Sequence, residues 1–133
     1  MTEISSYKTA CAIARILDDK KGQNIVILDI SKVSVLADYF VIVSAQTNTQ
    51  VKALTGYVRE KIKELFSRIP TGDENDTKNR WNLLDYGDVI VHVLHQEERE
   101  TYALEKFWSH AFTIKEEDWL NESKEYATYI DAQ

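Results

Sequence analysis

Apolar side chains recur at spacings of three and four in two segments of the chain, which predicts two amphipathic helices. The first covers residues 4–21 and ends in Lys20-Lys21-Gly22, a combination typical of a helix C-terminus. The second follows Thr47-Asn-Thr-Gln50, which fits a capping box, and stops before Pro70 and Gly72. Its apolar stripe consists of Val51, Leu54, Val58, Ile62, Leu65 and Ile69.

Short runs of β-branched and apolar residues predict the strands of a sheet. Residues 24–30 and 38–44 have the continuous apolar character of strands buried on two faces. Two more strands are predicted within residues 81–93, joined by a tight turn at Tyr86-Gly87. The polar residues 70–80 are predicted to form a loop, and residues 102–108 a short helix.

This order of elements predicts one α/β domain with a mixed β-sheet flanked by helices. The tight turn makes its two strands antiparallel neighbours, whereas the long second helix allows a parallel crossover. A chain of 133 residues can bury enough apolar surface to fold without disulfides or metals. We therefore expect a single fold.

Charge is distributed unevenly along the chain. Residues 115–133 hold six acids against two lysines, which contributes −4 to a total net charge of −6. We therefore divide the chain into a domain at residues 1–111 and an acidic C-terminal extension at residues 112–133. A helix in this extension would place Trp119, Leu120, Tyr126 and Ile130 loosely on one side.

The composition excludes several classes of protein. Clustered lysines and arginines, which a nucleic-acid-binding protein uses to neutralise phosphates, are missing, so nucleic acid is not expected as the main contact. The N-terminus lacks a basic stretch followed by an apolar core, and no apolar run approaches the roughly 20 residues of a membrane helix. We expect a soluble, cytoplasmic protein. Cys11 is a single thiol and is expected to be a small buried hydrophobe.

The acids and histidines do not form a complete catalytic pattern. Asp85 and Asp88, with Asp29, could bind magnesium in a nucleotide-processing enzyme, but they flank a turn, where aspartate is common as a cap. The sequence has no Asp-x-Asp pair. His92 and His95 lie three apart on a strand and so face opposite sides of it. We expect no catalytic, cofactor or metal site, and the enzyme hypothesis is the least favoured alternative.

The strand that begins at Trp81 has large apolar side chains on both faces. Trp81, Leu83 and Asp85 share one face, while Asn82, Leu84 and Tyr86 share the other. If Leu84 packs into the core, then Trp81 and Leu83 are exposed beside Lys78 and Arg80, as in a binding hot spot. The alternative is that a second helix covers them. Physical reasoning alone slightly favours the covered arrangement.

An ordered set of motifs resembles the iojap family of ribosomal silencing factors over residues 5–111. The shared residues are Val26-Ile-Leu-Asp29, Asp38-Tyr-Phe-Val-Ile42, Gln50-Val51, Trp81-x-Leu83-x-Asp85-Tyr-Gly-Asp88, Val91-His-Val93 and Tyr102-x-Leu104-Glu105-x-x-Trp108. The chain departs from the family in its Ala45, where a glycine usually follows the serine, and in the acidic extension.

The resemblance implies a fold similar to nucleotidyltransferases without their catalytic residues, and a function in binding. Members of the family dock on the fourteenth L-series protein of the large ribosomal subunit, block joining with the small subunit and repress translation under nutrient limitation. By this resemblance, Trp81 and Leu83 would be the anchors, and Asp85, Tyr86 and Asp88 would form the rim. A homodimer would also fit the family. The main alternative is a large-subunit assembly factor that uses the same docking face.

Overall fold

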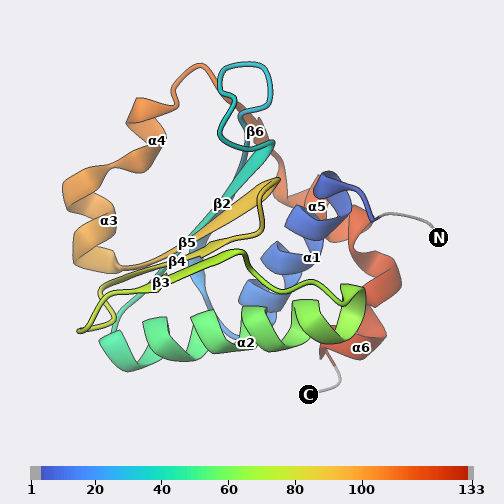
Figure 1. Ribbon diagram of the computed structural model, residues 1–133, viewed down its shortest axis with the longest axis horizontal. Coiled ribbons are helices and arrows are strands. Elements are labelled where there is room, and N and C mark those ends of the chain that lie inside the picture. Colours follow the sequence, from blue (N-terminus) through green and yellow to red (C-terminus); the bar gives the residue numbers. More distant parts are fainter. Residues whose placement is uncertain (1–3, 132–133) are drawn as a thin grey trace.

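In the computed structural model, which describes residues 4–131, the two most apolar strands pair in parallel at the centre of a six-stranded sheet (Figure 1). They are β2 (Tyr39–Ala45) and β5 (Val89–His95). The strand order is β3-β4-β5-β2-β1-β6, and the other pairings in the described part of the chain are antiparallel. The sheet is therefore mixed, which confirms the predicted α/β class. The outer strands are β1 (Gln23–Asp29), β3 (Gly72–Asn75), β4 (Trp81–Asp85) and β6 (Phe112–Ile114).

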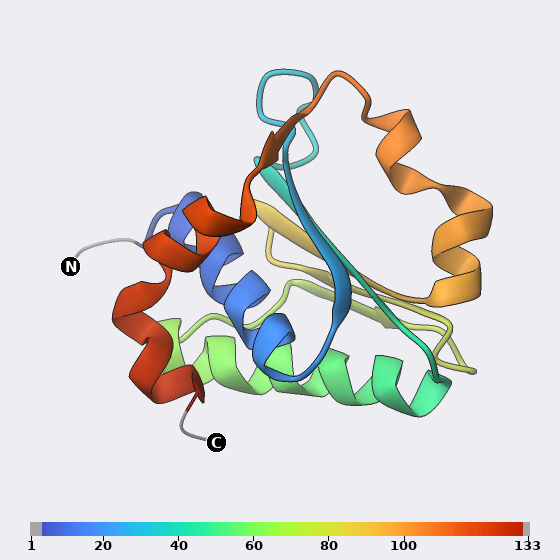
Figure 2. The same cartoon turned by 180° about the vertical axis from the view of Figure 1, so that it is seen from behind.

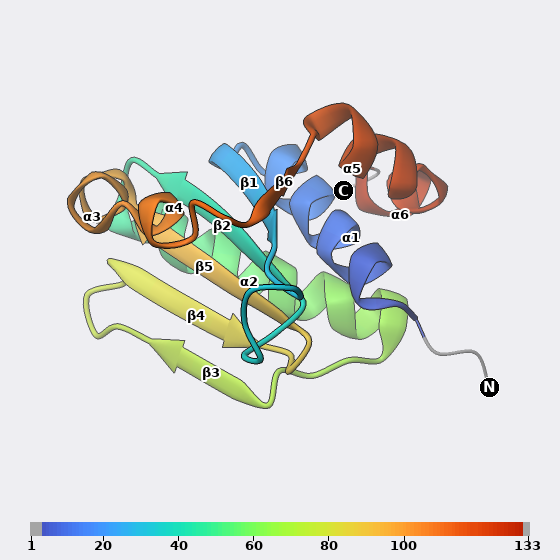
Figure 3. The same ribbon diagram turned by 90° about the horizontal axis from the view of Figure 1, so that it is seen from above.

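Helices cover the two faces of the sheet unequally (Figures 1 and 2). The long helices α1 (Ser6–Asp19) and α2 (Asn48–Phe66) pack together on one face. The short helices α3 (Gln96–Tyr102) and α4 (Leu104–Phe107) lie on the other face, and Figure 1 shows the two helical layers on either side of the sheet. Figure 3 looks onto the sheet from the α3 side, where β3 and β4 lie beside the short helices and not beneath them. None of the helices within residues 4–131 is long and apolar enough to cross a membrane.

Side chains alternate between these two layers along the central strands. Val41 and Val43 of β2 join the larger core beneath α1 and α2, whereas Phe40 and Ile42 join a smaller core on the α3 side. A strand places successive side chains on opposite faces, so a strand that is apolar at every position needs cover on both sides. The expectation of strands buried on two faces is confirmed for β2, in which all residues from Phe40 to Ala45 are buried.

Local signals in the sequence set the start and end of α2. The Thr47 hydroxyl accepts a hydrogen bond from the Gln50 backbone N–H at 3.0 Å, as the capping pattern predicted. The helix ends at Phe66 because Ser67 adopts a left-handed conformation, with φ of 56°. The predicted extension of its apolar stripe to Ile69 is wrong, since that side chain is 68% exposed.

The turn between α1 and β1 requires glycine at position 22 because the backbone passes close to β2. A Cβ atom on Gly22 would lie 2.6 Å from Val43 Cγ2 and 3.0 Å from the Leu17 carbonyl oxygen. This close approach, rather than a positive φ, explains why glycine occupies position 22.

Two predictions for the second half of the chain are corrected by the structure. The predicted loop at residues 70–80 contains β3, whose sequence Gly-Asp-Glu-Asn lacks the apolar signal of a strand because the strand lies at the sheet edge. The predicted helix at residues 102–108 is instead two helices, α3 and α4, separated by Ala103 in a left-handed conformation with φ of 44°.

The C-terminal segment packs against α1 and closes the larger core. It contains α5 (Glu116–Glu122), the 3-10 helix η1 (Lys124–Tyr126) and α6 (Ala127–Asp131). Trp119 and Ile130 are buried in the same core as the α1 side chains. Arg15 of α1 donates to the Ser123 hydroxyl at 2.9 Å and to the Leu120 carbonyl at 2.8 Å. Residues 112–131 thus share both the sheet and the core with the rest of the chain.

Substitution of Trp119 tests this role of the C-terminal segment. We expect Trp119→Ala to lower the free energy of unfolding by about 3–5 kcal/mol, because it removes a fully buried aromatic side chain and leaves a cavity. Urea unfolding followed by circular dichroism measures the change. Val35→Ala, at a fully exposed position, is the control and should change stability by less than about 0.5 kcal/mol. Equal stability of the two variants would contradict a structural role for this segment.

Candidate docking groove

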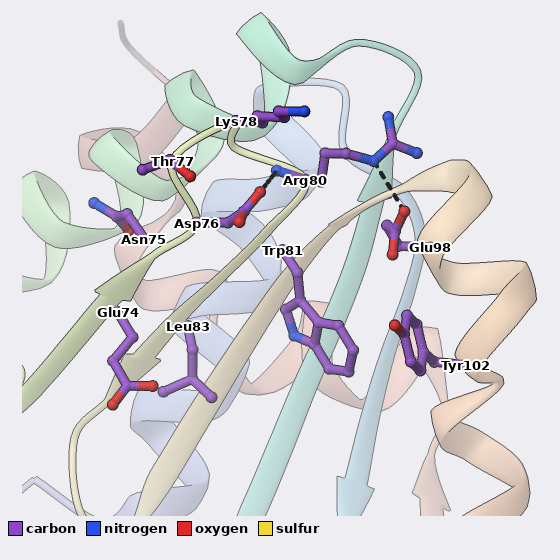
Figure 4. Close-up of a pocket in the computed structure, with 10 residues that line it drawn as sticks. All are labelled: Glu74, Asn75, Asp76, Thr77, Lys78, Arg80, Trp81, Leu83, Glu98 and Tyr102. Atoms are coloured by element: carbon purple, nitrogen blue, oxygen red, sulfur yellow. Dashed lines mark hydrogen bonds and ion pairs between the residues drawn. The ribbon is translucent and has the colours of Figure 1, made fainter.

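An open groove of about 720 Å³ lies between the β3–β4 hairpin and helix α3. Figure 4 shows that Trp81 and Leu83 line it from β4, while Tyr102 and Glu98 face it from α3. The polar residues that complete its lining come from β3 and the hairpin turn: Glu74, Asn75, Asp76, Thr77, Lys78 and Arg80. The groove therefore combines an aromatic and aliphatic floor with a charged rim.

Trp81 is partly buried and held from two sides. Its ring lies 5.0 Å from the Tyr102 ring, at an interplanar angle of 56°. Its indole Nε1–H donates a hydrogen bond to Nδ1 of His92 on the neighbouring strand, at 3.2 Å. The sequence left two arrangements open, an exposed Trp81 and a Trp81 covered by a second helix. The structure combines them, because α3 covers one side of Trp81 while the groove leaves another side accessible.

The rim contains charges of both signs, and an ion pair joins the two walls. Arg80 Nε donates to Glu98 Oε1 at 2.9 Å, which links the hairpin to α3. The Arg80 backbone N–H donates to Asp76 Oδ2 at 3.1 Å, and the Arg80 carbonyl accepts from the His95 N–H at 2.8 Å. Contacts on both sides of Arg80 therefore link the two walls of the groove.

Two of the five site residues expected from the sequence, Trp81 and Leu83, line this groove. Asp85 lies on the same face of β4 but outside the groove lining. One of its carboxylate oxygens accepts a hydrogen bond from the Gly87 backbone N–H at 2.7 Å, which closes the turn to β5. Gly87 has a positive φ of 91°, which this turn requires.

The other two expected rim residues, Tyr86 and Asp88, belong to a different part of the molecule. Tyr86 is 5% exposed in the larger core, and burial raises the pKa of its phenol to about 12. Asp88 forms a two-pronged ion pair with Arg68, with distances of 2.6 and 3.3 Å. Arg68 also donates to Thr9 of α1 at 3.2 Å. Both residues therefore connect the β4–β5 turn to the helices and do not line the groove.

The remaining chemically suggestive residues have structural partners. Asp29 Oδ1 accepts from the Ser31 hydroxyl at 2.6 Å. Among residues 4–131, no group of three or more histidines, cysteines or acids could hold a metal ion. Cys11 is buried, and desolvation raises the pKa of its thiol to about 12, so little thiolate exists at neutral pH.

The two strand histidines have separate roles. His95 ends β5 and caps α3, because its Nδ1 accepts from the Glu97 backbone N–H at 3.1 Å. His92 is 7% exposed, and its ring meets the edge of Phe40 at a centroid distance of 4.9 Å. Burial lowers the pKa of His92 to about 4, so the imidazole is neutral at pH 7 and can accept the Trp81 hydrogen bond.

Sequence reasoning missed three acids that line the groove: Glu74 of β3, Asp76 just after β3, and Glu98 of α3 on the opposite wall. These residues have no apolar periodicity, and they reach the groove only because β3 pairs with β4 and α3 folds back over the sheet. Glu74 lies opposite Leu83 in the pairing of β3 with β4, and no local signal in the sequence predicts this register.

Comparisons with known proteins relate the whole of this structure to one family. Residues 3–132 match the family model "Ribosomal silencing factor during starvation". The ribosomal silencing factor RsfS of Bacillus subtilis is 37% identical over 111 residues, covering 84% of this chain and 91% of the relative. A crystal structure of a Chromobacterium violaceum protein superposes with a TM-score of 0.76 at 33% identity, covering 80% of this chain and 88% of that one.

A more distant relative from Mus musculus carries the name "Mitochondrial assembly of ribosomal large subunit protein 1". It is 27% identical over 103 residues, which cover 73% of this chain and 43% of the mouse protein.

Burial of His92 makes stability depend on pH in a defined direction. The unfolded histidine binds a proton near pH 6.5, whereas the folded one does so only near pH 4. Stability conferred by the neutral ring is therefore complete above pH 6.5 and is lost as the pH falls to about 4. We expect this loss to be on the order of 3 kcal/mol.

Urea unfolding at several pH values between 7 and 4, with His92→Phe as the control, isolates this contribution from that of the carboxylates. The difference in unfolding free energy between the two proteins should shift in favour of His92→Phe as the pH falls. A difference that is constant with pH would show that His92 titrates normally in the fold.

Proposed function

Because the chain belongs to the family of ribosomal silencing factors, we propose that it binds the large ribosomal subunit and blocks joining with the small subunit. The family membership expected from the sequence is thereby confirmed. We further propose that the docking partner is the fourteenth L-series protein and that the result is repression of translation when nutrients are scarce. The name of the mouse relative refers to the large ribosomal subunit, which supports this choice of subunit.

The observation that carries the proposal is the groove beside Trp81. Binding hot spots are typically aromatic side chains in well-packed positions, surrounded by polar residues that exclude water. Trp81 has this setting, since Tyr102 and His92 hold its ring and a charged rim surrounds it. Leu83 extends the apolar floor along β4. Asp85, next on the same face, would contact the partner at the end of this floor.

Charge favours a ribosomal protein over ribosomal RNA as the main contact. The groove is lined by three acids, Glu74, Asp76 and Glu98, and by two bases, Lys78 and Arg80, which leaves an excess of negative charge. This excess disfavours a phosphate backbone and favours a basic protein surface. The overall charge of −6 acts in the same direction.

We propose that the protein acts by occupying space and not by catalysis. Asp85 closes a turn and Asp88 is paired with Arg68, so neither carboxylate is arranged for an incoming nucleotide. A standard protein interface buries about 800 Å² on each partner, which the sheet face around the groove can supply. The bound domain would then lie where the small subunit docks. Such a function places the protein in the cytoplasm with ribosomes.

The second candidate is a role in assembly of the large subunit, which the name of the mouse relative favours for that protein. An assembly factor would use the same groove, so the two functions predict the same binding and differ in the cell. Depletion would leave immature large subunits if the role is assembly. Normal subunits with unrestrained translation during starvation would instead support silencing.

Replacing Trp81 tests the docking proposal. We expect Trp81→Ala to weaken binding to large subunits by roughly 30- to 1,000-fold, or about 2–4 kcal/mol, because a central aromatic anchor is lost. Sucrose-gradient sedimentation of large and small subunits under joining conditions measures both co-migration and the loss of joined ribosomes. Sedimentation of the protein alone shows whether the unbound species is a monomer or a homodimer.

The matched control is Tyr57→Ala, which removes an exposed aromatic side chain from α2 on the opposite face of the sheet. This variant should bind and block joining like the parent protein. If Trp81→Ala is folded and still blocks joining, the groove is not the docking site. If the parent protein remains at the top of the gradient, the ribosomal proposal itself fails.

A further inference from the structure

The hydrogen bond between Trp81 and His92 connects the docking groove to a buried residue behind it. Leu83 is the direct cross-strand neighbour of His92, so Trp81 is its diagonal neighbour on the same face of the β4–β5 pair. Large side chains in this diagonal relation can reach one another. Here the indole Nε1–H meets the imidazole Nδ1 at 3.2 Å.

The position of His92 is unfavourable for a histidine that serves only to fill space. Because Nδ1 accepts a hydrogen bond, the neutral ring carries its proton on Nε2. That Nε2 atom is buried and has no hydrogen-bond partner within residues 4–131. An unpaired buried donor costs free energy, and a phenylalanine would fill the same space beside Phe40 without this cost. Packing therefore does not explain His92, whereas its Nδ1 acceptor does.

We propose that His92 is a positioning residue that fixes the indole of Trp81 in the orientation used for docking. The inference rests on the proposed function, because it assumes that Trp81 is the anchor. Tyr102 restrains the indole from the α3 side, and His92 restrains it from the sheet. A side chain that is already ordered loses less conformational freedom on binding, so the free protein presents a preformed anchor.

The test compares two substitutions that differ in the acceptor. His92→Phe keeps an aromatic ring but removes Nδ1, whereas His92→Asn offers an amide oxygen close to the position of Nδ1. We expect His92→Phe to weaken binding to large subunits about 10-fold and His92→Asn to stay within about 3-fold of the parent protein. Thermal unfolding should show both variants to be folded at the temperature of the binding assay, which excludes loss of fold as the cause.

Nuclear magnetic resonance of the indole groups reports on the orientation directly. The chain has three tryptophans, and the Trp81 indole signal is assigned as the one that disappears in Trp81→Phe. We expect this signal to shift upfield and its proton to exchange faster with water in His92→Phe, and to be retained in His92→Asn. Trp81→Phe, which lacks the donor, should weaken binding, and adding His92→Phe to it should weaken binding no further.

The outcomes separate this inference from the proposed function. If Trp81→Ala abolishes binding but His92→Phe binds normally with an unchanged indole signal, the positioning role is overturned and the docking proposal stands. If Trp81→Ala binds normally, the docking proposal is overturned, and with it the role of His92 in docking. The indole signal still shows in that case whether His92 orders Trp81.

Discussion

The parallel pairing of β2 with β5 is the constraint on which the rest of the structure depends. Both strands carry apolar side chains on both faces, so the sheet needs a helical layer on each side. The long helices α1 and α2 fill one side, and only the short α3 and α4 are available for the other. Cover on that second side is therefore incomplete near β4. The groove beside Trp81 is the part of the apolar sheet face that the short helices leave open.

The two acids of the turn between β4 and β5, Asp85 and Asp88, stabilise the turn and its contacts with neighbouring elements. The chain must reverse within three residues, and Asp85 closes this turn by accepting the Gly87 N–H. The carbonyl of Asp88 accepts the backbone N–H groups of Asp38 and Tyr39, while its side chain is paired with Arg68. One short segment thus connects the central strand pair with α1 and the C-terminal end of α2. Because these contacts occupy the carboxylates of Asp85 and Asp88, the two side chains are not positioned to bind a nucleotide or a metal ion.

The sequence predicted those elements whose signals are local. The Thr47 cap, the Tyr86-Gly87 turn and the alternation that places Leu84 and Trp81 on opposite faces of β4 all depend on residues within a few positions of one another. The family resemblance supplied the ribosome as the expected binding partner. Two features were missed: β3, because it is a polar edge strand whose place depends on pairing with β4, and the break between α3 and α4, because a left-handed alanine at position 103 is uncommon. Half of the groove was therefore beyond sequence reasoning, and so was the burial of Tyr86 beneath Arg68.

The groove is built from two walls that come from separate elements, and this has a consequence for recognition. The hairpin supplies Trp81, Leu83 and the acids near β3, while α3 supplies Tyr102 and Glu98. The Arg80–Glu98 pair joins the walls near the surface, where an ion pair adds little to stability. Its main effect is therefore to link the two walls in the structure of the free protein. A partner that binds here must contact both walls, so specificity comes from shape around an ordered tryptophan as much as from charge.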